Sequence, residues 1–116
     1  MSRERGRRIL TQVDIEEMIV DDNDLLQEAT DAYGDLLEEE ARLQNDYKRV
    51  FNAAYFSMQQ GGHDLRKTHA EREAQDERAA YTCKSAEAAA QKEVLWTIRM
   101  RIESIRSLNA NQRSQV

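Results

Sequence analysis

The chain has 116 residues, enough for one domain with a core of moderate size. Charged residues make up 34% of it and aromatic residues only 6%, and alanine supplies much of the apolar fraction, which excludes a large conventional globular core. Because proline is absent and glycine occurs only at positions 6, 34, 61 and 62, we predict an all-α fold.

The net charge of -5 is unevenly distributed along the chain. Residues 1–8 carry four Arg and one Glu, residues 9–46 carry thirteen acids and only Arg42, and residues 47–116 carry twelve bases and eight acids. The three segments therefore contribute +3, -12 and +4. The acidic total does not exclude an anionic partner for the C-terminal part.

Cys83 is the only cysteine, which excludes an internal disulfide and fits a reducing compartment. No apolar run approaches the ~18 residues that a membrane span needs, and the basic N-terminus is followed by no apolar signal segment. We expect a cytoplasmic protein without a membrane partner.

The first eight residues show no periodicity, and we interpret them as a flexible basic arm. A short helix is predicted over about 11–20, with Thr11 capping a turn that Asp14 closes. The run from Asp21 to Asp24 favours a new helix N-terminus, because carboxylates cap and stabilise that end.

The second helix is predicted over about 24–60, because apolar residues recur there at spacings of three and four. Gly34 interrupts this helix, and either a close helix crossing or a slight bend would explain it. Gly61 and Gly62 are predicted to end the helix, since glycine adopts the left-handed conformation of a C-terminal cap without strain.

A third helix is predicted over about 68–108, where Thr68 and Glu71 have the spacing of a capping box. Its apolar stripe is alanine-rich at first and aliphatic toward the end. Together with the second helix it is expected to form a long antiparallel hairpin, so that residues 9–116 make one helical domain.

A two-helix hairpin gives each helix only one neighbour, and these apolar stripes are too wide for a single neighbour to cover. We therefore expect the hairpin to assemble as a homo-oligomer, for which a ring is one candidate form. The bulky end of the third helix supplies the expected oligomer interface, which consists of Leu95, Trp96, Ile98, Ile102 and Ile105.

Enzyme chemistry is not indicated. His63, His69 and Cys83 have neither the spacing of a metal site nor the flanking residues of a catalytic triad, and Gly61-Gly62 lacks the residues of a nucleotide-binding loop. We expect no catalytic residue, no metal and no cofactor.

A basic cluster lies on both sides of the Gly61-Gly62 turn, and a hairpin would fold its two parts onto one end. Aromatic residues are interleaved there, so that bases could stack while phosphates are neutralised. The alternative is a solvated tip with the aromatic residues in the core. The candidate nucleic-acid-binding residues are Lys48, Arg49, Arg66, Lys67 and Arg72, and the stacking candidates are Tyr47, Tyr55 and Phe56, with Phe51 between them.

The order of these features resembles the UvsY-type recombination mediators of bacteriophages over about residues 14–108. The resemblance rests on the stretch DLLQEATDAYGDLL after an acidic cap, on Lys48-Arg49 before AAYFSM and a glycine-bearing loop, and on the aliphatic stretch VLWTIRMRIESIRS. It implies a ring-like homo-oligomer in the host cytoplasm that binds single-stranded DNA and contacts recombinase and single-strand-binding protein. In this sequence His63 and Asp64 follow the glycines, where the family has a basic residue.

The leading functional hypothesis is therefore an oligomeric single-stranded-DNA-binding accessory factor of a bacteriophage. The alternative is a non-enzymatic protein-interaction module, such as a scaffold, an assembly chaperone or a host-defence inhibitor, that uses the acidic first half.

Overall fold

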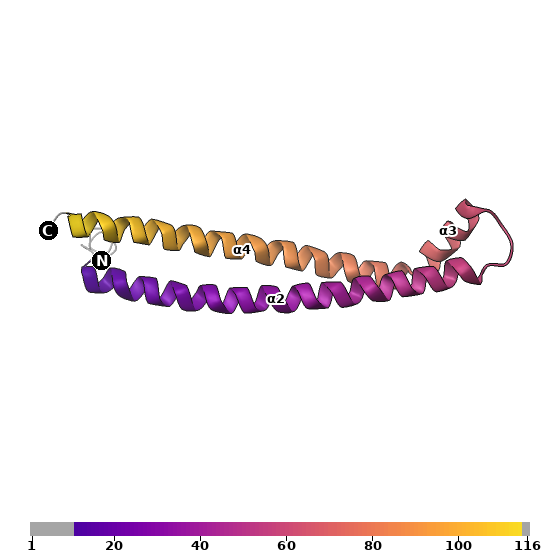
Figure 1. Cartoon of the computed structure of the whole chain (residues 1–116), viewed down its shortest axis with the longest axis horizontal. Helices are drawn as coiled ribbons and strands as arrows, with labels where there is room; N and C mark the ends of the chain where they lie inside the picture. Colours follow the sequence, from indigo (N-terminus) through magenta and orange to yellow (C-terminus); the bar gives the residue numbers. More distant parts are fainter. Residues whose placement is uncertain (1–10, 115–116) are drawn as a thin grey trace, which may run out of the picture. The chain divides into compact units, whose positions relative to one another are not determined.

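The computed structural model describes residues 11–114, and these residues form three α-helices without any strand. The helices are α2 (Gln12–Ser57), α3 (His63–Glu73) and α4 (Gln75–Ser114), as labelled in Figure 1. The predicted all-α class is confirmed. The basic arm predicted over residues 1–8 lies outside the described residues.

The start of α2 has the cap that the sequence predicts. The Thr11 backbone N–H donates to Asp14 Oδ2 at 3.1 Å, and the Asp14 N–H donates to Thr11 Oγ1 at 3.1 Å. This reciprocal pair satisfies two backbone donors that a helix N-terminus would otherwise leave without partners. The negative charge of Asp14 also suits the positive end of the helix dipole.

The break predicted at Asp21–Asp24 is wrong, because α2 continues through it to Ser57. Aspartate is a poor helix former by less than ~1 kcal/mol per residue, a preference that tertiary packing readily overrides. Here Asp22 is 1% exposed and accepts a hydrogen bond from Arg101 Nε at 2.9 Å. The aspartate that helped to suggest a boundary is thus part of a helix–helix contact.

The glycine pair lies in the turn after α2, but the predicted C-terminal cap is wrong, because α2 ends at Ser57, before Met58, Gln59 and Gln60. Gly61 has φ +107°, a conformation that strongly favours glycine, and Gly62 is the N-cap of α3. The predicted start at Thr68 is wrong: α3 begins at His63, and Thr68 Oγ1 donates to the Asp64 carbonyl inside the helix at 2.9 Å. The chain therefore re-enters a helix directly after the glycines.

A second boundary that the sequence did not predict separates α3 from α4 at Ala74, whose φ of -97° and ψ of 15° depart from helical values. Backbone hydrogen bonding continues across it, because Ala74 N–H donates to the Ala70 carbonyl and Arg78 N–H donates to the Ala74 carbonyl, both at 2.9 Å. Ala70 and Ala74 are fully buried. The boundary is thus a change of helix direction at a buried alanine.

The chain divides into two compact units that share α2 and α4. Within the described part of the chain, unit 1 comprises residues 11–30 and 93–114, and unit 2 comprises residues 31–92.

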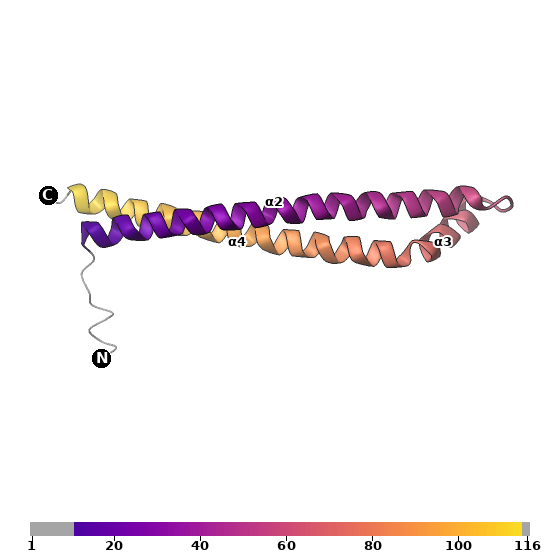
Figure 2. The ribbon, with the colours of Figure 1, turned by 90° about the horizontal axis from the view of Figure 1, so that it is seen from below.

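Unit 1 is an antiparallel helix pair in which the first turns of α2 lie beside the last turns of α4, as both views show (Figure 1 and Figure 2). Gln12 Nε2 donates to Asn109 Oδ1 at 2.6 Å, and the Asp22–Arg101 ion pair is the next cross-link along the seam. The positions buried on α2 are seven residues apart, which is the spacing of a coiled-coil seam. The apolar core of this unit consists of Ile15, Ala29, Leu95, Ile102 and Ile105.

Unit 2 has a thinner core that depends on small residues. Ala70, Ala74 and Ala88 are its buried apolar side chains, whereas the larger Tyr47 and Val50 of α2 are only half-buried. Alanine lets two helix backbones approach closely but buries little apolar area. This unit therefore has less hydrophobic stabilisation per turn than unit 1.

Substitution by alanine is predicted to change the free energy of unfolding in opposite directions at Gly34 and at Gly61. A Cβ added at Gly34 would meet no atom within 4 Å, so a close helix crossing does not explain this glycine, and Gly34→Ala should stabilise α2 by up to about 1 kcal/mol. A Cβ at Gly61 would lie 2.6 Å from Leu65 Cδ2 at a positive φ, so Gly61→Ala should destabilise the protein by more than about 1 kcal/mol. Urea unfolding followed by circular dichroism measures both changes, and equal shifts in one direction would contradict the assignment.

Removal of Arg101 is predicted to cost more free energy of unfolding than removal of its partner Asp22. Arg101→Ala leaves a buried carboxylate without its partner and should lower the free energy of unfolding by about 3 kcal/mol. Asp22→Leu leaves an arginine that is already largely exposed, and should be neutral or stabilising. Chemical unfolding of both single variants and the double variant tests this, and an Arg101→Ala cost no larger than that of Asp22→Leu would refute it.

Candidate nucleic-acid interface

A row of aromatic side chains follows one side of the end of α2 in unit 2. Tyr47, Phe51 and Tyr55 are four residues apart, and their ring centroids are separated by 5.9 and 6.4 Å. Residues at this spacing lie one above the other on a helix surface. The row therefore presents a continuous aromatic strip that ends near the turn.

His63 extends this row across the turn, which the sequence pattern could not reveal. Tyr55 Oη lies 2.8 Å from His63 Nδ1 in a hydrogen bond, and the two rings meet edge to face at 5.7 Å. The bond links the end of α2 to the first residue of α3. No helical periodicity connects residues 55 and 63, because the glycine turn separates them.

Phe56 is the most open aromatic residue of the cluster. Its ring packs edge to face against Tyr55 at 5.0 Å, yet its side chain is 74% exposed. Tyr47 and Tyr55, the other two stacking candidates, are half-buried. Phe56 therefore offers a free ring face, and the neighbouring tyrosine holds it in place.

Lys48 and Arg49 lie beside this cluster on the exposed surface of α2. Lys48 is eight residues before Phe56, so the two lie on one helical row about 12 Å apart. Arg49 is 76% exposed, and its Nη2 lies 3.5 Å from Asp46 Oδ1. Such an exposed pair is worth at most about 1 kcal/mol, so it leaves the guanidinium free to exchange partners.

The remaining three candidate cations all lie on α3 and not in the turn. Arg66 is half-buried and its Nε has no hydrogen-bond partner within the described residues, while Lys67 lies 4.0 Å from Glu71. At about 100° per residue, Arg72 is roughly 120° around the helix from Arg66. These three side chains do not share one face of α3, so Lys48 and Arg49 carry the more coherent basic surface.

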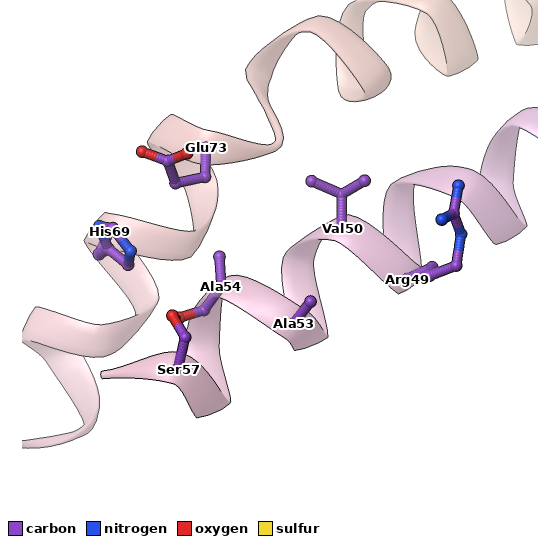
Figure 3. A pocket seen from close by; sticks show the side chains of 7 residues that line it. All are labelled: Arg49, Val50, Ala53, Ala54, Ser57, His69 and Glu73. Atoms are coloured by element: carbon purple, nitrogen blue, oxygen red, sulfur yellow. The ribbon is translucent and has the colours of Figure 1, made fainter. Parts of the chain in front are cut away.

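A groove of about 490 Å³ lies between the end of α2 and α3 (Figure 3). Five of its lining residues come from α2 and the other two, His69 and Glu73, from α3. Arg49 lines the groove on the α2 side together with alanine, valine and serine residues, and the carboxylate of Glu73 on α3 would repel a phosphate. The groove therefore suits an anion less well than the outer surface that carries Lys48 and Phe56.

The charge of this region changes abruptly after Asp46. Arg42 forms a hydrogen bond with Glu39 and lies 3.4 Å from Asp46, and the bond with Arg42 lowers the pKa of Glu39. From position 47 through Gly62 the sequence contains two bases and no acid. A polyanion that approaches the aromatic strip thus meets no carboxylate on that segment.

The expected oligomer-interface residues are divided by the fold. Leu95, Ile102 and Ile105 are buried within unit 1 and Ile98 is half-buried, so these four side chains serve mainly the chain's own helix pair. Trp96 is 60% exposed on the outer surface of α4. Of the five, it is the one available to another molecule.

Comparisons with protein-family models, with curated proteins and with solved structures find no match to this chain. Within residues 11–114, no group of three or more His, Cys, Asp or Glu side chains is arranged to hold a metal ion. None of the described helices combines the length and the apolar character of a membrane span.

Proposed function

We propose that this protein is an oligomeric single-stranded-DNA-binding accessory factor of the recombination-mediator type, acting by binding alone. The observation that carries the proposal is the exposed Phe56 ring, which lies in an acid-free segment beside an aromatic strip and two exposed cations. Exposed aromatic rings next to lysine and arginine are the usual means of binding a single strand without sequence preference.

In this proposal the ring of Phe56 stacks on an unpaired base, while Lys48 and Arg49 neutralise phosphates along the strand. A duplex keeps its bases stacked inside, so the aromatic ring selects single strands. Every base has a π-face, which makes the contact independent of sequence.

Two cations and one ring supply only weak binding per subunit, and assembly of several subunits would multiply it. Once one subunit holds the strand, the next binds at a high effective concentration. The resemblance to UvsY-type mediators extends the proposal to contacts with recombinase and single-strand-binding protein in the host cytoplasm.

Removal of the two cations on α2, Lys48 and Arg49, should lower the affinity for a single strand and make that affinity less dependent on salt. Lys48→Glu with Arg49→Glu should lower the affinity for a fluorescent oligothymidylate at least about tenfold, and should reduce the slope of log K against log[salt] by about 1.4, or 0.7 per phosphate contact. Fluorescence anisotropy across a salt series measures both quantities.

Arg66→Glu with Lys67→Glu serves as the matched comparison, because it makes the same charge change on α3. The affinity lost on the α2 substitutions is expected to exceed the affinity lost on the α3 substitutions. Wild-type protein that binds no oligonucleotide at low salt would contradict the proposed function, and equal losses for the two variants would contradict the assignment to α2.

Loss of the Phe56 ring should weaken binding without unfolding the protein, because the side chain is mostly exposed. Base stacking is worth about 1–3 kcal/mol, so Phe56→Ala should lower the affinity about 5- to 150-fold at constant salt slope. Leu37→Ala, at another exposed apolar position of α2 in unit 2, is the control and should leave the affinity unchanged. Equal affinities of the two variants would exclude stacking on Phe56.

A further inference from the structure

The two helices of unit 1 carry opposite charge. The α2 segment, residues 11–30, has seven acids and no lysine or arginine, whereas the α4 segment, residues 93–114, has four arginines and two glutamates. One acid, Asp22, is buried in the seam and paired with Arg101. Most of the other charged side chains of unit 1 therefore lie outside the seam.

Four acids of the α2 segment form a continuous outer row, which we call the acidic face. It consists of Glu17, Asp21, Asp24 and Glu28, all of them exposed and spaced by four, three and four residues. Such spacing places them on one side of a helix, away from Ile15, Asp22 and Ala29. None of the four forms an ion pair with another residue of the described chain.

Large apolar side chains accompany this acidic face. Val13 and Val20 are 60% and 58% exposed, and a groove of about 240 Å³ lies between them, lined also by Glu16, Glu17 and Asp21. Two exposed valines at a spacing of seven residues repeat the pattern of a coiled-coil seam on the opposite side of the helix. The face thus combines an apolar strip with a negative border.

On α4 the arginines form a matching row, which we call the arginine row. Arg99, Arg106 and Arg113 are exposed and seven residues apart, about 10.5 Å along the helix. Trp96 precedes Arg99 by three residues, so its exposed ring lies beside the row, with the exposed Met100 one turn further. Arg106 contacts Glu103 at 3.3 Å in an exposed pair that is easily exchanged.

The two rows are complementary in sign, repeat and apolar content. Glu17 and Asp24, like Asp21 and Glu28, are seven residues apart, so their spacing along the helix equals that of the arginine row. Contact between two acidic faces, or between two arginine rows, would place like charges together. Only an acidic face opposite an arginine row satisfies both partners.

We propose that unit 1 carries a two-sided self-association surface, in which the acidic face of one copy docks on the arginine row of a second copy. Val13 and Val20 then meet Trp96 and Met100 inside the charged border. Such a contact is heterologous, so two docked copies still expose one acidic face and one arginine row between them, and assembly continues until a ring closes or a filament forms. This proposal supplies the contact for the oligomer in the proposed function, but it involves unit 1 only and needs no DNA.

The test uses the full chain without DNA. Sedimentation velocity should show larger species as the concentration rises, and the single tryptophan, Trp96, should shift its emission to shorter wavelength as it becomes buried. Arg99→Glu with Arg106→Glu should raise the concentration of half-assembly about tenfold or more, and Asp21→Arg with Glu28→Arg should do the same. Arg72→Glu with Arg78→Glu, an equal charge change in unit 2, should leave assembly unchanged.

The decisive variant combines all four substitutions of unit 1, which exchanges the charges at positions 21 and 28 with those at positions 99 and 106. Heterologous docking predicts that this variant assembles again, and that a mixture of the two double variants also assembles. A wild type that stays monomeric, an Arg99→Glu/Arg106→Glu protein that assembles normally, or a fourfold variant that stays monomeric would each overturn the proposal. Circular dichroism checks that every variant is helical, and oligonucleotide anisotropy is measured separately, so loss of assembly and loss of DNA binding are distinguishable.

Discussion

Among the described residues of unit 1, α2 and α4 have only each other as helical neighbours, and this constraint shapes the surface of the pair. One neighbour can cover only a narrow stripe of a helix, here the seam of Ile15, Asp22 and Ala29 against Leu95, Ile102 and Ile105. Side chains far from that stripe face outward, whether they are polar or apolar. The exposure of Trp96 and Val20 therefore follows from the packing geometry, and it is what makes the outer faces candidates for recognition.

The buried Asp22 gives the seam of unit 1 a property that apolar packing lacks. A carboxylate that is 1% exposed is costly unless it is paired, and only Arg101 of α4 meets it at 2.9 Å. A shift of one helix past the other by a turn would separate these groups. The ion pair therefore favours one register of the helix pair, just as a polar seam residue does in a coiled coil.

The proposed DNA contact and the proposed contact between copies lie in different units and use different chemistry. The end of α2 in unit 2 combines an open phenylalanine ring with cations and no acid, whereas unit 1 separates its charge between two helices. One arrangement suits a polyanion with exposed bases, and the other suits a second copy of the same chain. A protein that holds a strand through many weak contacts needs both.

The helical class, the Thr11–Asp14 cap and the position of the turn at the glycine pair could be predicted from the sequence, because each of these depends on residues a few positions apart. It also indicated the tyrosines and lysines near the turn. It failed at Asp21–Asp24 and at Thr68, where a local capping signal competes with helix continuation. Those two boundaries depended on contacts outside the local sequence, because the partner of Asp22 lies 79 residues away and Gly62 is already the N-cap of the helix that contains Thr68. For the same reason, only packing could show that Leu95 and Ile102 are buried within the chain while Trp96 and Phe56 are open.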